Sequence, residues 1–216
     1  MAILPASFLF RFTLEVPRVD RIPRAKSPLL KLPQSSLLNL PVELDHPGFA
    51  EFALGWNPQG LCISCRLSGK SQRPFCSPED VFRSDRLQLW IDTRDTKTVH
   101  RATRYCHHFV ILPTGGDGTE QPLVEQHPVP RANEDAAEVD IDSILVESST
   151  DETGYDISVW FPKDALFGFE ADPSQKIGFF AAVFDKELGA QHLALDDDFP
   201  FDSDPSLWCT LQLQDS

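Results

Sequence analysis

DRLQLWIDTRD, residues 85–95, alternates apolar and polar side chains over the length of one strand. One set of alternate residues is aliphatic, and the other is polar except for a tryptophan: Leu87, Leu89 and Ile91 against Gln88, Trp90 and Asp92. A period of two is typical of a β-strand that packs one face on a core. The stretch therefore predicts a strand whose outer face, with its tryptophan, is a candidate binding surface.

Segments on both sides of this strand show similar alternation, or apolar runs bounded by turn residues. They cover residues 7–16, 52–56, 61–67, 106–112, 139–148, 155–161, 177–184 and 206–213. The turn NPQG at 57–60 joins two of them as a hairpin, and residues 162–166 suit one short helical turn. About nine strands with little helix predict an all-β fold, a single antiparallel β-sandwich of jelly-roll or immunoglobulin-like type.

Length and composition fit one folded domain. The 216 residues are 41% hydrophobic, which is enough for a core, and 18 prolines with 11 glycines supply many chain breaks. No repeat and no linker divides the sequence. We therefore expect residues 1–216 to form a single domain, with Trp56 and Trp208 in its core.

The charge balance limits the classes of partner. A formal net charge of -14 argues against nucleic acid and against an anionic membrane surface. No apolar run approaches the roughly 20 residues of a membrane span. The start, MAILPASFLFRF, lacks the basic region of a signal peptide, so we expect a cytoplasmic protein.

The cysteine pattern favours reduced thiols. Five cysteines cannot all pair, and a protein without a signal peptide is expected to keep them reduced. Cys62 and Cys65 form a CxxC, but a strand over 61–67 would point them to opposite faces. The sequence therefore predicts neither a redox pair nor a metal site at these two thiols.

Five segments in this order resemble the family 9 carbohydrate-binding modules and the wider DOMON-like sandwiches. They are FALGWNPQGLCISCRLSGK (52–70), SDRLQLWIDTRD (84–95), GYDISVWFPKDALFG (154–168), KIGFFAAVFDKE (176–187) and PSLWCTLQL (205–213). The resemblance runs from about residue 8 to residue 213, and Asp85, Asp92 and the 177–185 segment are its most specific parts. One departure is Lys163 after Pro162, where the family often has an aromatic residue.

This resemblance implies a β-sandwich that binds a ligand and does not catalyse a reaction. Members of the two groups bind sugars or haem, and the haem binders commonly use a Met and a His. The only methionine of this chain is Met1, which leaves haem without its usual ligand pair.

Two tryptophans on polar strand faces are the candidate sugar platforms. Trp90 shares its face with Gln88 and Asp92, and Trp160 shares its face with Ser158. A flat ring can stack on the apolar face of a sugar while neighbouring amide and carboxylate groups bind its hydroxyls. In the alternative interpretation both rings pack under a covering loop, formed by residues 17–36 or 113–137.

A basic island follows the same strand. Residues 93–108 carry seven Arg, Lys and His side chains against a single acid. A long connection at a strand end often holds binding groups, so we expect Arg101, Arg104 and His108 to close the site over an anionic or hydroxyl-rich ligand. The alternative is an internal network of ion pairs with the protein's own acids, such as Asp140.

Metal and cofactor sites have weaker support. Residues 196–205, DDDFPFDSDP, could bind calcium but lack the spacing of a calcium loop. His107 and His108 are adjacent on a strand and point to opposite faces, and no other spacing matches a zinc site. We expect no cofactor.

The expected function is therefore binding of a saccharide or a small polyol by the outer face around Trp90. The alternative is a sandwich whose sheet face docks a protein partner. A sugar site requires an exposed aromatic ring in a groove, and a docking face requires a broader apolar patch.

Overall fold

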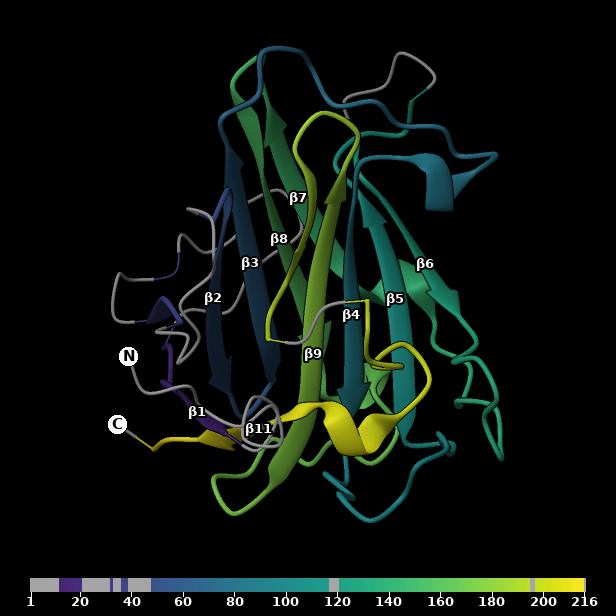
Figure 1. The fold of residues 1–216 in the computed structure, drawn as a ribbon. Helices are drawn as coiled ribbons and strands as arrows, with labels where there is room; N and C mark the ends of the chain where they lie inside the picture. The colour runs from purple at the N-terminus through teal and green to yellow at the C-terminus, as the bar shows by residue number, and fades with distance from the viewer. Residues whose placement is uncertain are drawn as a thin grey trace, which may run out of the picture.

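The computed structural model describes residues 12–20, 32, 36–38, 48–116, 121–194 and 197–215. These residues form two β-sheets that pack face to face (Figure 1). The larger sheet has the order β1 (Thr13–Val16), β11 (Cys209–Leu213), β9 (Lys176–Asp185), β4 (Arg86–Asp92), β5 (Cys106–Leu112) and β6 (Leu123–His127), with β10 (Gly189–His192) also paired to β9. The smaller sheet has the order β2 (Ala50–Asn57), β3 (Gly60–Ser68), β8 (Gly154–Pro162) and β7 (Leu145–Thr150).

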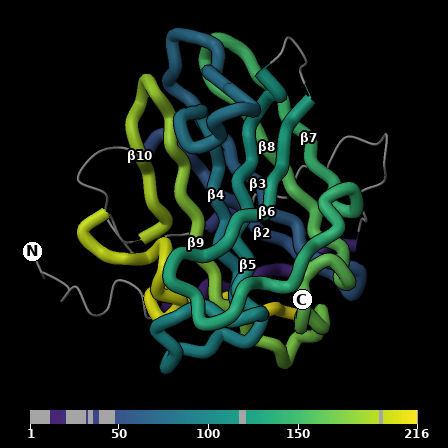
Figure 2. Tube along the Cα trace, turned by 90° about the vertical axis from the view of Figure 1, so that its right-hand side faces the viewer, coloured from purple at the N-terminus to yellow at the C-terminus, as the bar shows by residue number. Residues whose placement is uncertain are grey.

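The predicted all-β sandwich is confirmed. The described pairings are antiparallel except for β1, which runs parallel to β11. Strand β9 is long enough to pair with β4 along one edge and with β11 and then β10 along the other. Figure 2 shows β10 beside β9 at the border of the sheet. Strands β9, β4 and β5 therefore form a continuous surface in the larger sheet.

The opening stretch forms β4 as predicted, and its aliphatic face lies in the core. Leu87, Leu89 and Ile91 are completely buried between the sheets. Trp56 and Trp208 are also buried, as expected. Since β4 sits between β9 and β5, its other face supplies the middle row of the sheet's outer surface.

The predicted hairpin at NPQG is confirmed. The Asn57 side chain accepts a hydrogen bond from the backbone N–H of Gln59 at 2.9 Å, which stabilises the turn between β2 and β3. A glycine is required at the end of this turn because a Cβ on Gly60 would lie 2.2 Å from the carbonyl oxygen of Phe161. The predicted helical turn after β8 is also present, as a 3-10 turn at Lys163–Ala165.

Some predicted strand bounds are wrong. The strand expected from residue 139 begins at Leu145, because residues 141–143 form a 3-10 turn closed by hydrogen bonds from Ser143 to the Asp140 carbonyl. The last strand begins at Cys209 for a similar reason: the Asp204 carboxylate accepts from the Ser206 N–H and caps a 3-10 turn at Pro205–Leu207.

Two short strands were not predicted at all. They are β6, which lies within the expected 113–137 loop, and β10. Both are edge strands of four or five residues with mostly polar sequences, LVEQH and GAQH, so the apolar signal is weak. Of the strand expected over 7–16, residues 7–11 lie outside the described part of the chain.

The two thiols of the CxxC point apart. Cys65 lies in the core between the sheets, and Cys62 packs against Trp160 on the outer face of β3. All five cysteines are unpaired. Burial raises the pKa of the Cys62 thiol to about 12, so it remains protonated and unreactive at neutral pH.

A buried ion cluster explains the acidic residues at the start of β4 and the end of β9. The Lys70 ammonium lies 3.1 Å from the Asp85 carboxylate and 2.6 Å from that of Asp185, and all three side chains are buried. Asp85 also accepts hydrogen bonds from the backbone N–H groups of Phe75 and Lys186. Burial lowers the pKa of Lys70, but the Asp185 and Asp85 carboxylates outweigh that effect and raise it overall. The cluster joins three separate segments next to the outer face.

Candidate functional site

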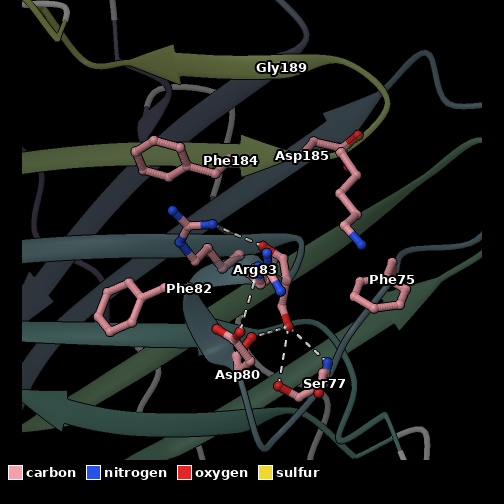
Figure 3. A pocket seen from close by; sticks show the side chains of 11 residues that line it. Phe75, Ser77, Asp80, Phe82, Arg83, Phe184, Asp185 and Gly189 are labelled. Atoms are coloured by element: carbon pink, nitrogen blue, oxygen red, sulfur yellow. Dashed lines mark hydrogen bonds and ion pairs between the residues drawn. The ribbon is translucent and has the colours of Figure 1, made fainter.

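Two adjoining cavities of about 610 Å³ each lie on the outer face of the larger sheet. We call one the Trp90 cavity, which also contains Gln88 and His108, and the other the Arg86 cavity. Phe82 and Phe184 line both, so the two cavities adjoin on the outer face of β9, β4 and β5, and we call the pair the groove. Figure 3 shows the Arg86 cavity, with Phe82 and Phe184 on one side and Phe75 across from them.

Trp90 forms the floor of its cavity and offers no ring face to a ligand. It is only 2% exposed. In the sheet register Trp90 stands between His108 and Phe180, and the His108 ring stacks on it at 4.6 Å and 3°. Phe180 and Phe201 meet it edge-on at 5.9 and 5.5 Å. Phe201 of the 197–202 segment covers the indole, and His127, Pro128 and Pro130 of the expected 113–137 loop line the same cavity.

The indole nitrogen of Trp90 makes no hydrogen bond. Its Nε1 is buried, and no acceptor for its hydrogen exists among the described residues. A buried N–H without an acceptor costs about 1–3 kcal/mol relative to a satisfied one. By contrast, the Nε1 of Trp56 and of Trp208 each donate to a backbone carbonyl. Trp90 is thus the one tryptophan of these three that lacks an acceptor, and it lines a cavity.

A polar chain runs along the floor from one cavity to the other. A single orientation of the Gln88 amide satisfies both neighbours: its oxygen accepts from Arg86 Nε at 2.7 Å, and its nitrogen donates to His108 Nε2 at 2.9 Å. Burial lowers the pKa of His108 to about 3, so its ring is neutral and Nε2 can accept this bond. The amide and imidazole are therefore held in fixed orientations at the base of the groove.

Phe82 is the exposed aromatic ring that lines both cavities. Its side chain is 48% exposed, and it meets the His127 ring edge-on at 4.9 Å. His127 is itself held by the Glu125 carboxylate, 2.9 Å from its Nε2. A half-exposed, supported ring above a polar floor is the arrangement that a sugar-stacking site requires.

The ends of the groove differ in charge. Asp197, Asp198 and Asp202 lie at the rim of the Trp90 cavity, and Asp197 is 3.3 Å from the His192 ring. The Arg86 cavity is lined by three cations, Arg83, Arg86 and Lys186. A bound molecule would thus meet acids at one end and bases at the other.

The structure does not bring every expected site residue to this groove. Asp92 lies at the end of β4, where its carboxylate accepts from the backbone N–H groups of Arg94 and Thr96 at 3.0 and 2.8 Å. The side chain is 3% exposed, and its burial raises the pKa of Asp92 although the two hydrogen bonds lower it. Its observed contacts are those of a residue that holds the turn after β4.

Trp160 lies in the other sheet. It stands on β8, is 3% exposed, and clusters with Cys62, with Leu145 and with Leu32 of the expected 17–36 loop. The two tryptophans that the alternation pattern placed on polar faces are thus on different sheets, and the structure does not bring them together. Both are covered, as the alternative interpretation anticipated.

The basic segment leads away from the groove. Arg101 and Arg104 are exposed, and neither lines either cavity. The Arg104 guanidinium contacts the Phe167 ring at 4.5 Å and the Glu134 carboxylate at 3.7 Å. Of the three residues expected to close the site, His108 alone reaches it.

One Ser–His–Asp contact lies in the same region and does not form a catalytic triad. The Nδ1 of the exposed His100 is 3.0 Å from the Asp204 carboxylate and 3.1 Å from the Ser206 hydroxyl. A triad requires the acid and the serine on opposite ring nitrogens. Because both contacts use one nitrogen, His100 cannot pass a proton from the serine while the acid orients it.

The described residues show no metal centre and no membrane-spanning helix. No three His, Cys, Asp or Glu side chains in this part of the chain are arranged to hold a metal ion. Asp196, in the acidic segment considered for calcium, lies outside the described residues. In the same part of the chain no helix has the length and apolar character needed to cross a bilayer.

Sequence reasoning missed several groove residues, among them Phe82, Arg86, His127 and Phe184. Arg86 had a usable signal, since it continues the alternation of Gln88 and Trp90 by one step. Phe184 continues the same pattern on β9 from Phe180. Phe82 and His127 had none, because they come from a 3-10 turn and an edge strand that only the tertiary fold places over β4.

The chain is similar to known proteins in structure but not in sequence. No family model matches the chain, and no curated protein matches it in sequence. A carbohydrate-binding module of family 9 from Caldicellulosiruptor kristjanssonii, solved with cellotriose, matches with a TM-score of 0.65 at 11% identity, over 94% of this chain and 93% of that one.

Two further structures agree. A module of the same description and organism, solved with glucose, matches with a TM-score of 0.65 at 12% identity, covering 94% of this chain and 95% of that one. A candidate carbohydrate-binding protein from Bacteroides uniformis matches with a TM-score of 0.57 at 10% identity, covering 94% and 99%. At 10–12% identity these matches show the fold alone. The chain has the fold of the family 9 carbohydrate-binding modules.

Proposed function

We propose that this chain is a non-catalytic binding protein and that its ligand is a saccharide held in the groove. Phe82, in place of Trp90, is the ring on which the sugar stacks. Gln88 and His108 form the polar floor, although their amide and ring nitrogens already bond each other. A small polyol would meet the same floor without using the ring.

The unsatisfied N–H of Trp90 is the observation that carries this proposal. The described protein atoms leave this buried donor without an acceptor, on the floor of a cavity large enough for a sugar ring. A sugar can accept this hydrogen bond through a hydroxyl oxygen, and its ring can stack its apolar face on Phe82. The matched structures in complex with cellotriose and glucose support this choice of ligand class.

Calorimetric titration with glucose and cellotriose tests the proposal, using Phe82→Ala and the control Phe167→Ala. Both rings are partly exposed, at 48% and 39%, so neither truncation should unfold the protein. Phe82→Ala should weaken binding about fivefold or more, since an aromatic contact contributes about 0.5–1.5 kcal/mol beyond its area. Phe167→Ala should bind as the unaltered protein does.

Two results would count against the proposal. One is the absence of heat and of any thermal shift with either sugar at millimolar concentration. The other is an equal loss in both variants. A protein-docking face, the second candidate, would then lead, because Phe75 and Phe82 are both 48% exposed beside the groove.

We also propose that the protein is cytoplasmic. Five unpaired cysteines, four of them buried, support a reducing compartment such as the cytoplasm. Fractionation of the native host, followed by thiol counting under denaturing conditions, would test it. Five free thiols in the soluble intracellular fraction are expected.

A further inference from the structure

The Arg86 cavity combines aromatic walls with cations. Phe75, Phe82 and Phe184 line it together with Arg83, Arg86 and Lys186 (Figure 3). It adjoins the proposed sugar site, because Phe82 and Phe184 also line the Trp90 cavity. A molecule stacked on Phe82 would therefore present its next substituent, or its next sugar unit, to these cations.

Two of the three cations have no ion-pair partner in the part of the chain that the structure describes. The carboxylates that line the cavity already face cations: Asp80 is 3.8 Å from Arg83, and Asp185 is 2.6 Å from Lys70. No carboxylate of the described residues lies within 4.0 Å of the charged nitrogens of Arg86 or Lys186. In a chain with 33 acidic and 19 basic residues, two neighbouring cations without a partner are unexpected.

The Arg86 guanidinium is held in place by contacts that leave its charge uncompensated. It lies 4.1 Å from the Phe184 ring centroid and 5.8 Å from that of Phe82, and it donates to the Ser84 carbonyl at 3.1 Å. Burial lowers the pKa of Arg86, although more distant carboxylates such as that of Asp85 raise it. The Gln88 oxygen takes the Nε side of this partly desolvated guanidinium, and one N–H on each terminal nitrogen is left to bind a planar anion.

Lys186 completes the arrangement. Its ammonium lies 3.3 Å from the centroid of the exposed Phe75 ring, and its backbone N–H is fixed by Asp85. It belongs to the turn after β9 and lines the same cavity as Arg86. One cation from strand β4 and one from the turn after β9 thus line the same aromatic-walled space.

We propose that the Arg86 cavity is a subsite for the anionic substituent of an acidic saccharide, a sugar carboxylate or sulfate ester, with Arg86 and Lys186 as its specificity-determining residues. This inference rests on the proposed function, because the sugar ring occupies Phe82 and the Trp90 cavity. The acidic rim of Asp197, Asp198 and Asp202 repels the anion from the other end and so fixes the direction in which the ligand lies.

The experiment compares three monosaccharides by calorimetry on the full chain. They are methyl glucoside, methyl glucuronide and methyl glucoside 6-sulfate, and sodium acetate and sodium sulfate serve as anions without a sugar. The glucuronide or the sulfate ester should bind about tenfold more tightly than the glucoside at low salt, because charge-assisted bonds are about twice as strong as neutral ones. The arm that binds more tightly identifies which anion the cavity takes.

Three variants test whether Arg86 and Lys186 cause the preference for the charged sugar. Lys186→Gln should reduce the preference for the charged sugar to about threefold or less and leave glucoside affinity within about twofold. Arg86→Gln should reduce the preference as well, and its glucoside affinity should also fall because Arg86 orients the Gln88 amide. Lys176→Gln removes an exposed lysine at the start of β9 and should leave the preference unchanged. If Arg86→Gln does not fold, Lys186→Gln still decides.

The outcomes separate the two proposals. Equal affinity for neutral and charged sugars overturns the subsite while the saccharide proposal stands. A preference that persists in Lys186→Gln and Arg86→Gln also overturns it. Acetate or sulfate binding as tightly as the charged sugars would show a simple anion site and refute the acidic saccharide. Binding of none of the sugars refutes both proposals.

Discussion

Lowering the pH from 7.5 to 5.0 should destabilise this protein by about 4 kcal/mol, because two histidines are buried in neutral form. Burial lowers the pKa of His107 to about 4 and that of His108 to about 3, from 6.5. A depressed pKa means that the unfolded chain binds protons in this range and the folded chain does not, so stability falls as the pH falls. Each histidine loses about 2 kcal/mol over the 1.5 units between pH 6.5 and 5.0, at 1.36 kcal/mol per unit.

Other groups change this number little above pH 5. The raised pKa of Asp92 acts in the opposite sense, because the folded state then holds its proton more tightly than the unfolded chain. The lowered pKa values of the exposed Asp151, Asp172 and Glu187 act in the same direction as the histidines, but mainly below this window. The histidines therefore dominate the slope.

Urea unfolding, followed by tryptophan fluorescence at pH 7.5, 6.5, 5.5 and 5.0, measures the effect. In His107→Leu, a replacement suited to the apolar neighbours Ile91 and Phe109, the loss between pH 7.5 and 5.0 should shrink to about 2 kcal/mol, since one titrating group is gone. A native protein that loses less than about 1 kcal/mol, or a variant with an unchanged slope, would refute the assignment of neutral buried rings.

Two further substitutions test the framework of the fold. Lys70→Met leaves Asp85 and Asp185 buried without their cation and should lower the free energy of unfolding by about 3–5 kcal/mol in urea titration; a cost below about 1 kcal/mol would show that the ion cluster is not structural. Gly60→Ala brings a methyl group against the Phe161 carbonyl at 2.2 Å, so its melting temperature should fall by several degrees, whereas an unchanged melting temperature would contradict the close packing of β3 and β8.

The sequence predicts the sheets better than it predicts the site, for a physical reason. Strand β4 is recognisable because its aliphatic face must be buried, and burial imposes a period of two on the residues themselves. The Asn57–Gly60 turn is equally local. Strands β6 and β10 lie at sheet edges, where the constraint to bury one face is weak, and they leave no such pattern.

The candidate site depends on segments that are distant in sequence. Alternation identified Gln88 and Trp90 as outer-face residues, and His108 was placed near them through the basic segment. The alternation of residues could not show that the 197–202 segment covers the Trp90 ring, since Phe201 lies 111 residues away along the chain. For the same reason Trp160 looked equivalent to Trp90, although the pairing of β8 with β3 puts it on the other sheet.

The covering of Trp90 changes its expected role without removing it from the site. A stacking platform loses its function when its faces are packed, whereas a buried donor without a partner still gains a hydrogen bond from any acceptor that a small local shift brings to it. Its neighbours are apolar or already bonded: His108 Nε2 is paired with Gln88, and Phe180 and Phe201 offer only ring carbons. No acceptor for the Trp90 N–H exists among the described residues, so we expect a ligand in the cavity to supply one. Trp90→Phe, which keeps an aromatic ring and removes the donor, should thus weaken sugar binding while Trp56→Phe, whose N–H already has the Gln214 carbonyl, should not.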